Sequence, residues 1–457
     1  MKAISTIFFF LFCAGITAFG QATDSAMIRK IANEILQHGN AYENLRYLCK
    51  KIGPRLSGSE NAQKAVLATA DMLRKAGADT VYLQPCMVPH WVRGAKETAY
   101  IRFDGENVHN LHACALGNSV GSGKAGISAG VIEVRSFDEL NRLGEAVIKG
   151  KIVFFNFEMN PTYIRTFRAY GESGIARRNG PAQAARYGAI GVMIRSLASN
   201  ADDYPHTGGT QYNDSFPKIP AIAISTNDAI WLSAELAKKK PIDAYIKTNC
   251  EMLPDEPSFN VIGEIKGSRL PGEIITVGGH LDSWDLAEGA QDDGAGCVQA
   301  IEIIRAYSSL KIRPVRTIRA VMFMNEENGG KGAQAYLDEA VKKKENHLFA
   351  LESDAGGFTP RGISLDMKEP QRNKIMGWKN LFYEYGVYEF TSGGSGSDIG
   401  PLKKVGTALA GFSPDSQRYF DVHHAGSDVF ETVSKRELHL GAANMAALIW
   451  LVSEYGL

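Results

Sequence analysis

The sequence has no surplus of charge of either sign. Its 457 residues include 50 Lys and Arg and 50 Asp and Glu, so the formal net charge is zero. This balance gives no reason to expect nucleic acid or an anionic membrane surface as a partner. Beyond the N-terminus, no stretch reaches the roughly 18 apolar residues that a membrane-spanning helix needs. The length predicts two domains, or one domain with a large insertion.

Cysteine is scarce, and its spacing matches no metal-binding or disulfide framework. Without Cys13, which lies in the N-terminal segment, the cysteines are Cys49, Cys86, Cys114, Cys250 and Cys297. An odd number without a CxxC pair argues against a zinc ribbon and against a dense set of disulfides. Buried free thiols are the simplest interpretation. A Cys114–Cys250 disulfide is the alternative, because both residues lie near the ends of the insertion described below.

The first 20 residues have the pattern of a secretory signal peptide. A basic start at Lys2 precedes a short apolar core over residues 7–14, and small residues surround a cleavage position after Gly20. A lipoprotein anchor at Cys13 is less favoured, because Phe12 stands where a small residue is needed. We therefore predict an exported protein, located in the periplasm or outside the cell.

The chain changes character between residues 111 and 249. A Gly- and Ser-rich stretch is followed there by short apolar runs, at residues 130–134, 151–155, 189–194 and 219–224. Polar helical stretches separate these runs. The pattern predicts an inserted unit of α/β or mostly β structure.

Strands alternate with helices in the flanking segments, residues 21–110 and 250–457. Strands are expected at 80–83, 260–265, 274–277, 317–324 and 348–351, and helices at 26–39, 59–76, 294–307, 332–343, 372–385 and 434–453. Ser59 and Ser434 are expected helix caps. Such alternation predicts an α/β fold with a mixed, mainly parallel sheet covered by helices. Chemistry in these sheets is located at the carboxyl ends of the strands.

Acidic residues and histidines follow several of the expected strands. In chain order they are His280, Asp282, Asp292, Asp293, Glu326, Glu327, Glu352, Asp354, His423, His424 and Asp428. No Lys or Arg occurs between Arg269 and Arg305, so the acids there need water or a metal as their counterpart. One acidic strand end is usually a solvated loop, whereas four such segments in order indicate a site. Carboxylates and imidazoles without cysteine suit zinc or a similar divalent ion, and a carboxylate can bridge two ions.

The order H-x-D, D-D-G-A-G, N-E-E, S-D and H-x-x-x-D resembles the M28 metallopeptidases, the co-catalytic zinc aminopeptidases. The likeness covers essentially the whole mature chain, including the insertion. It implies a zinc exopeptidase fold, with residues 111–249 as an inserted protease-associated domain. It also implies a homodimer that acts on small peptides.

The resemblance further implies two zinc ions in each chain. One ion would be bound by His280, Asp292 and Asp354. The other would be bound by Asp292, Glu327 and His424, so that Asp292 bridges the pair. His423 is the alternative to His424 as the last ligand.

Other site residues take roles by the same resemblance. Glu326 would be the general base, and Asp282 would accept a hydrogen bond from the far nitrogen of His280. The peptide bond between Asp292 and Asp293 is expected to be cis. Asp428 would support the last ligand loop or cap a helix end.

Three further residues are weaker candidates. Ser395 and Asp398 match a substrate-side loop, although a flexible turn has the same composition. His206 is either a residue that reaches the active site or an ordinary surface histidine. The remaining histidines are expected to be structural or exposed: His38, His90, His109, His112, His347 and His439.

The predicted function is that of a two-zinc exopeptidase which hydrolyses dipeptides or short peptides with a free N-terminus. A non-catalytic receptor or scaffold on the same fold is one alternative. A single-zinc acyltransferase of the glutaminyl cyclase type is another. The complete set of ligands and the base disfavour both.

Overall fold

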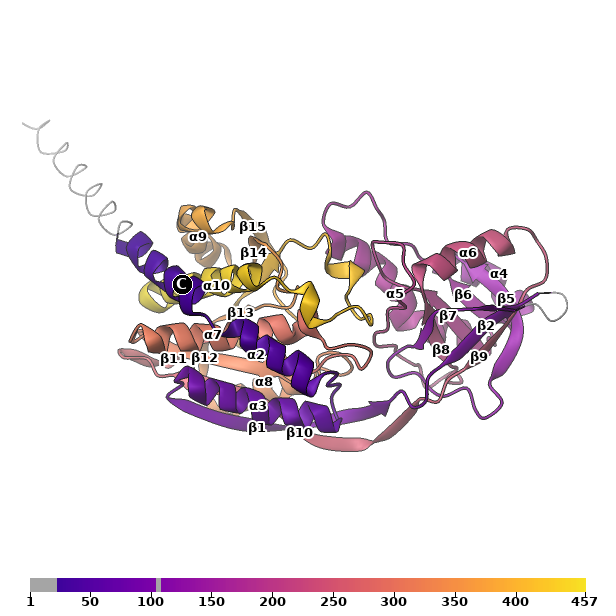
Figure 1. The fold of residues 1–457 in the computed structure, drawn as a ribbon, viewed down its shortest axis with the longest axis horizontal. Coiled ribbons are helices and arrows are strands. Elements are labelled where there is room, and N and C mark those ends of the chain that lie inside the picture. The colour runs from indigo at the N-terminus through magenta and orange to yellow at the C-terminus, as the bar shows by residue number, and fades with distance from the viewer. Residues whose placement is uncertain (1–22, 104–107) are drawn as a thin grey trace, which may run out of the picture.

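The computed structural model describes residues 23–103 and 108–457. The expected signal peptide, including Cys13, lies outside the described residues. Within these ranges the chain forms two mixed sheets of eight strands each, which lie side by side (Figure 1). None of the helices in the described part combines the length and the apolar character needed to cross a membrane.

The first sheet has parallel strands at its centre and confirms the mixed α/β fold. Strands β12, β11, β13 and β16 run parallel, and β10 and β14 pair antiparallel on either side. In sheet order the strands are β1 (Thr80–Val92), β10 (Glu251–Ile265), β12 (Arg316–Phe323), β11 (Leu270–His280), β13 (Asn346–Glu352), β16 (Ala408–Pro414), β14 (Pro360–Asp366) and β15 (Glu389–Ser392). The last three strands were not anticipated.

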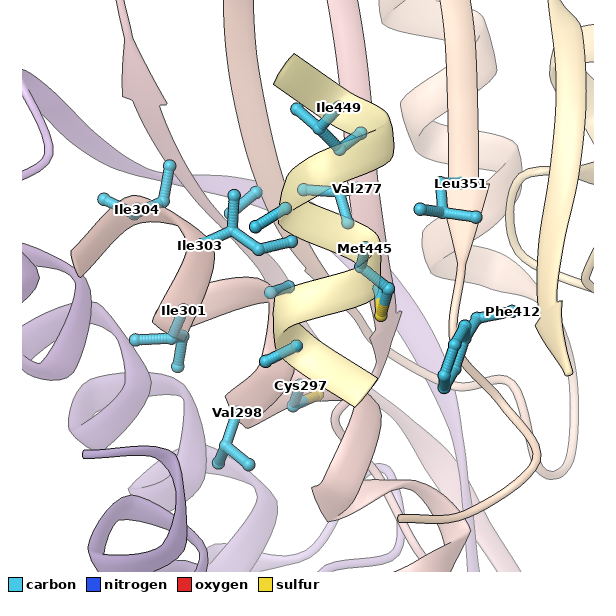
Figure 2. Packing of buried hydrophobic residues seen from close by; sticks show 14 of the residues in the cluster. Val277, Cys297, Val298, Ile301, Ile303, Ile304, Leu351, Phe412, Met445 and Ile449 are labelled. Carbon is cyan, nitrogen blue, oxygen red and sulfur yellow. The ribbon is translucent and has the colours of Figure 1, made fainter. Parts of the chain in front are cut away.

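Helices cover both faces of this sheet because the side chains of its buried strands alternate. In β12, Ala320 and Met322 join the core on one face, whereas Val321 and Phe323 join the core on the other. The first core includes the helix over residues 23–38, α2 (Ala41–Tyr47), α3 (Glu60–Ala76), α7 (Ala295–Ser309) and α10 (Lys435–Tyr455). Figure 2 shows α7 and α10 packed there over Val277 and Leu351. The second core is covered by α8 (Lys331–Lys343).

The expected helix caps are present, but one helix is shorter than expected. Ser59 and Ser434 each accept a backbone hydrogen bond at the start of α3 and α10. The helix expected over 372–385 is instead α9 (Glu369–Gly377), followed by two short 3₁₀ turns. Gly377 ends the α-helix, consistent with the low helix propensity of glycine.

The second sheet is built by residues 98–247, which we call the outer segment. In sheet order its strands are β3 (Val108–Asn110), β2 (Thr98–Arg102), β9 (Asp243–Lys247), β5 (Ile127–Val134), β6 (Ile152–Phe155), β7 (Gly191–Arg195), β8 (Ala221–Ile224) and β4 (Ala113–Ala115). The four apolar runs seen in the sequence are β5 to β8. Strands β2 and β3 precede residue 111 and join the sheet because β2 pairs with β9. Its helices are α4 (Phe137–Ile148), α5 (Thr166–Ala185) and α6 (Thr226–Leu236).

A long two-stranded ribbon connects the two sheets. The chain leaves the first sheet on β1 and returns on β10, and the two strands pair from Thr80 opposite Glu264 to Val92 opposite Glu251. The register shifts once, between Val88 and His90. The outer segment therefore begins and ends at the same place on the first sheet (Figure 1).

The cysteines of the described residues are buried and free. The alternative of a Cys114–Cys250 disulfide is wrong, because both thiols are unpaired. Cys114 belongs to a core of the outer segment, whereas Cys250 packs in a separate cluster with Trp91 and Trp284. Free buried thiols are therefore the correct interpretation.

Candidate active site

Adjacent parallel strands bring the candidate residues to one edge of the first sheet. His280 ends β11 and lies opposite Phe323 near the end of β12. Glu326 and Glu327 follow β12, and Asp354 follows β13 on the other side of β11. The carboxyl ends of parallel strands share one edge, so three distant segments meet there.

The five expected metal ligands form one connected cluster around Asp292. The Nε2 atom of His280 lies 3.2 Å from Oδ1 of Asp292 and 3.6 Å from Oδ1 of Asp354. The Nε2 atom of His424 lies 3.1 Å from Oδ2 of Asp292 and 3.1 Å from Oε2 of Glu327. Each oxygen of the Asp292 carboxylate thus faces a different group of ligands.

The spacing and the chemistry of this cluster fit zinc. Tetrahedral ligands about 2.0–2.2 Å from a zinc ion lie roughly 3.3–3.6 Å from each other. The Nε2–O distances around Asp292 are close to that range. Burial raises the pKa of Glu327 to about 8 and that of Asp354 to about 6. A nearby cation would offset this cost of burying carboxylates.

Unpaired oxygens in the cluster point to the same conclusion. Oδ2 of Asp292 and Oε1 of Glu327 are buried and have no partner in hydrogen-bond geometry in the described part of the chain, although Oδ2 of Asp292 lies 3.1 Å from Nε2 of His424. Such acceptors are rare in folded proteins unless an ion or water satisfies them. Two groups at metal-ligand spacing share Asp292: His280 with Asp354, and His423 with His424, and Glu327 lies 3.1 Å from His424. The residues present therefore fit a pair of divalent ions that share Asp292.

Both histidines of the last segment lie near Asp292. The His423 and His424 rings stack with their centroids 3.6 Å apart, and Nε2 of His423 is 3.5 Å from Oδ2 of Asp292. His424 is closer to Asp292 and also contacts Glu327. Asp292, His423 and His424 lie at metal-ligand spacing from one another, so both histidines remain candidates for the last ligand, and His424 is the one that also contacts Glu327.

The turn that carries Asp292 is held by two other buried carboxylates. Asp428 accepts hydrogen bonds from the backbone N–H groups of Gln291 at 2.8 Å and of Asp292 at 3.1 Å. Burial raises the pKa of Asp428 to about 7. Asp293 accepts from the backbone of His280, and the Asp292–Asp293 peptide bond is cis, as expected. Asp428 thus binds backbone N–H groups at the start of the helical turn Ala290–Gly294, which is the helix-capping alternative and not support of the last ligand loop.

Asp282 differs from its expected position. Its carboxylate lies 3.9 Å from Nδ1 of His280, which instead faces the backbone carbonyl oxygen of Asp282 at 2.9 Å. The carboxylate accepts hydrogen bonds from the backbone of Asn325 at 2.7 Å and of Glu326 at 3.1 Å. Asp282 therefore orients His280 through its carbonyl and the Glu326 turn through its side chain.

Two acids of residues 278–297 have basic partners, contrary to the sequence-based expectation. Nη2 of Arg93 lies 2.6 Å from Oδ1 of Asp285, and Nζ of Lys50 lies 2.8 Å from Oε1 of Glu288. These partners lie well outside the interval between Arg269 and Arg305, so inspection of neighbouring residues missed them. Among the described residues, no lysine or arginine forms an ion pair with Asp282, Asp292 or Asp293.

Arg55 also supports this loop and was missed by the sequence analysis. Its buried guanidinium donates hydrogen bonds to the carbonyl oxygens of Leu281 at 2.6 Å, Glu288 at 2.6 Å and Gly289 at 2.9 Å. Backbone carbonyls carry no signature in the sequence, and Arg55 lies more than two hundred residues away. No pattern could have indicated the contact.

Comparison with known proteins supports the conclusion from the geometry. The model of "Peptidase family M28" matches residues 260–449. Carboxypeptidase Q of Homo sapiens is 35% identical over 415 residues, which cover 91% of this chain and 84% of the relative. This chain belongs to peptidase family M28. It is a metallo-exopeptidase and a hydrolase.

Solved structures agree with this assignment. An M28 peptidase precursor from Shewanella amazonensis has a TM-score of 0.90 and 30% identity, and the match covers 95% of this chain and 97% of that one. A zinc aminopeptidase from Bacillus subtilis has the same fold, with a TM-score of 0.64 and 21% identity over 91% of this chain and 95% of that one. The M28 fold therefore extends over both sheets.

The candidate site of this M28 peptidase opens into a cavity of about 680 Å³. One side is lined by Asp292, Glu326 and Asp354, and the other by residues of the outer segment, including Tyr170 and Arg178. Ser397 and Asp398 also line it, whereas Ser395 is not among the lining residues. The space for a substrate thus lies between the two sheets.

His206 contacts the loop that carries His424, although neither it nor the other six histidines are among the residues that line the cavity. Its Nδ1 atom lies 2.6 Å from the backbone carbonyl oxygen of His423, and the side chain is buried. The six are His38, His90, His109, His112, His347 and His439. The interpretation of His206 as an ordinary surface residue is therefore wrong.

Proposed function

We propose that this M28 peptidase is a two-zinc exopeptidase that hydrolyses dipeptides or short peptides with a free N-terminus. The observation that carries the proposal is the position of Asp292 between two ligand groups, His280 with Asp354 and Glu327 with His424. When bound there, zinc would polarise the scissile carbonyl and make water more acidic.

Glu326 is the general base in this proposal. It lines the cavity beside Glu327, and its side chain has no hydrogen bond or ion pair within residues 23–103 and 108–457. The carboxylate is thus free to take a proton from the attacking water and to deliver it to the leaving amine. Asp282 holds its backbone through the bond at 3.1 Å.

Asp398 would bind the amino group of the substrate. Asp398 is one of the residues at the cavity, it is buried, and neither carboxylate oxygen has a hydrogen-bond partner in the part of the chain described. A substrate ammonium group would supply both the missing donors and the opposite charge. Ser395, the other residue of this loop proposed from the sequence, has no comparable support.

Arg178 would favour peptides that end close to the scissile bond. It lines the opposite wall of the cavity, and no described residue forms a hydrogen bond or an ion pair with its guanidinium. A free guanidinium matches the terminal carboxylate of a short peptide in shape and charge. The cavity is also of the size typical for small ligands.

The remaining proposals concern the whole chain. We propose that the insertion, expected over residues 111–249, is a protease-associated domain whose sheet also includes β2 and β3. The resemblance to the family supports a homodimer. The N-terminal pattern supports export with removal of the first 20 residues.

The decisive experiment compares Glu326→Gln with the wild type on a panel of dipeptides. The variant should retain two zinc ions per chain and lose about 10²–10⁴-fold in kcat, the usual contribution of a general base. Glu384→Gln, a change at an exposed glutamate outside the cavity, is the control. Exhaustive chelation should abolish the release of free amino acids.

Other outcomes would support the alternatives. A scaffold would release no amino acid, and a cyclase of the glutaminyl type would bind one zinc ion and cyclise N-terminal glutamine. Activity that survives complete chelation would refute the metal mechanism. A Glu326→Gln variant as fast as the wild type would refute the base.

A further inference from the structure

Two residues of the outer segment run alongside the loop that carries His424. The backbone N–H of Thr207 donates to the carbonyl of His424 at 2.9 Å, and His206 forms an isolated antiparallel bridge with Ala425. Nδ1 of His206 lies 2.6 Å from the carbonyl oxygen of His423. The candidate ligand is therefore held by a part of the chain that belongs to the other sheet.

Thr207 also contacts the imidazole of His424. Its carbonyl oxygen lies 3.2 Å from Nδ1 of His424 and 3.3 Å from Nη1 of Arg177, and it can accept from both. Nη1 of Arg177, which can only donate, also lies 3.2 Å from Nδ1 of His424. The carbonyl of Thr207 only accepts, so it bonds the ring when the proton of a neutral His424 is on Nδ1. The lone pair of Nε2 is then available on the side that faces Asp292 and Glu327.

The backbone of His424 needs such support. Its φ is 63°, in the left-handed region that non-glycine residues seldom adopt. A strained conformation of this kind persists only when surrounding contacts hold it. The bonds from His206 and Thr207 are among those contacts.

Residues 206 and 207 are in turn anchored to the second sheet. The backbone N–H of His206 donates to Oγ of Ser196 at 2.8 Å, and that hydroxyl donates to the carbonyl of Ile224 at 2.7 Å. The hydroxyl of Thr207 donates to the carbonyl of Ala115 at 2.8 Å. Ile224 ends β8 and Ala115 ends β4, so the position of the second sheet is transmitted to His424.

We propose that His206 is a positioning residue for one of the two metal sites. Its Nδ1–H holds the carbonyl of His423, while the carbonyl of Thr207 orients the His424 ring toward Asp292 and Glu327. The outer segment is thus a part of that metal site and more than a wall of the cavity. This inference rests on the proposed two-zinc function.

The test measures zinc affinity by equilibrium competition with a chelator, ion by ion, together with Tm. His206→Leu removes the hydrogen-bond donor. It should lower the affinity for the zinc ion at His424 about 10–100-fold, the usual effect of losing a partner that orients a ligand. The affinity for the other zinc ion, at His280, should change less than about twofold. His206→Asn restores an N–H near the position of Nδ1 and should return the affinity to near the wild-type value.

A matched control is available on the same sheet. The ring of His109 stacks on Trp231, and its Nε2 atom lies 3.2 Å from Oδ1 of Asp228. Neither of these contacts involves the loop of His424. His109→Leu should lower Tm at most and leave both zinc affinities unchanged. Equal weakening in this control would show that general damage to the outer segment explains the effect, and it would overturn the proposal.

Two further results would also overturn it. One is an unchanged affinity in His206→Leu, and the other is an equal loss of both ions. If His206→Leu does not fold, Ser196→Ala takes its place and should lower the affinity for the zinc ion at His424 several-fold. An unchanged affinity in Ser196→Ala would refute the inference. A wild-type protein that binds fewer than two zinc ions would instead refute the proposed function.

Discussion

Arg55→Met tests how the loop of residues 281–289 is held. The guanidinium of Arg55 is fully buried and donates to three backbone carbonyls, those of Leu281, Glu288 and Gly289. The described residues provide no carboxylate as its ion-pair partner, so its role is to satisfy those carbonyls. Methionine fills most of the volume and donates no hydrogen bond.

The expected loss follows from these three contacts. An unsatisfied buried polar group costs about 1–3 kcal/mol, so three abandoned carbonyls should lower the free energy of unfolding by roughly 3–6 kcal/mol after partial relaxation of the loop. Arg55→Lys should recover only part of this, because an ammonium lacks the planar fork that reaches three carbonyls. Arg46→Met, at an exposed arginine on α2, should change stability by less than about 0.5 kcal/mol.

The assay is urea unfolding of metal-free protein, followed by far-ultraviolet circular dichroism. Metal must be absent because bound zinc stabilises the folded state by mass action and would mask the change. A loss below about 1 kcal/mol in Arg55→Met would refute the reasoning, since it would mean that water or the loop itself replaces all three donors.

Two more predictions concern the substrate and the response to pH. Asp398→Asn keeps the size of the side chain but removes its charge, so KM for dipeptides should rise about 10–100-fold with a smaller change in kcat; an unchanged KM would place the substrate amine elsewhere. Burial lowers the pKa of His439 from 6.5 to about 4. Its neutral ring therefore contributes stability above pH 6.5 that is lost as the pH falls toward 4. Over this window the wild type should lose roughly 1–2 kcal/mol more than His439→Leu, measured by unfolding at each pH; equal losses would contradict the assignment.

The centre of the first sheet was predictable because its strands are buried on both faces. Residues 274–277, 317–324 and 348–351 are nearly continuous apolar runs, and they lie within β11, β12 and β13 or extend one residue beyond. Strands β14 and β16 were missed because Gly362, Gly411 and Pro414 interrupt their apolar character. Helix α9 was predicted too long because residues beyond Gly377 keep a helical composition but form only short turns.

The candidate ligands were predictable for a different reason. Each follows a strand end or a motif, and the fold needs only parallel strands to bring them together. Asp282 and Asp428 were expected as supporting residues, but two other residues that hold the site were not predictable. Arg55 donates to the backbone carbonyl of Leu281, and the backbone carbonyl of Thr207 contacts the ring of His424. Both contacts join residues far apart in the chain, and contacts with backbone carbonyls leave no pattern in the sequence.

The paired strands β1 and β10 have a topological consequence. Because the chain departs and returns along one antiparallel ribbon, everything between Val92 and Glu251 is the loop of a single hairpin. A tight turn could replace that loop without rethreading any strand of the first sheet. Such a shortened protein would keep His280, Asp292 and Glu327 in place. It would lose the contacts that His206 and Thr207 make with the loop of His424.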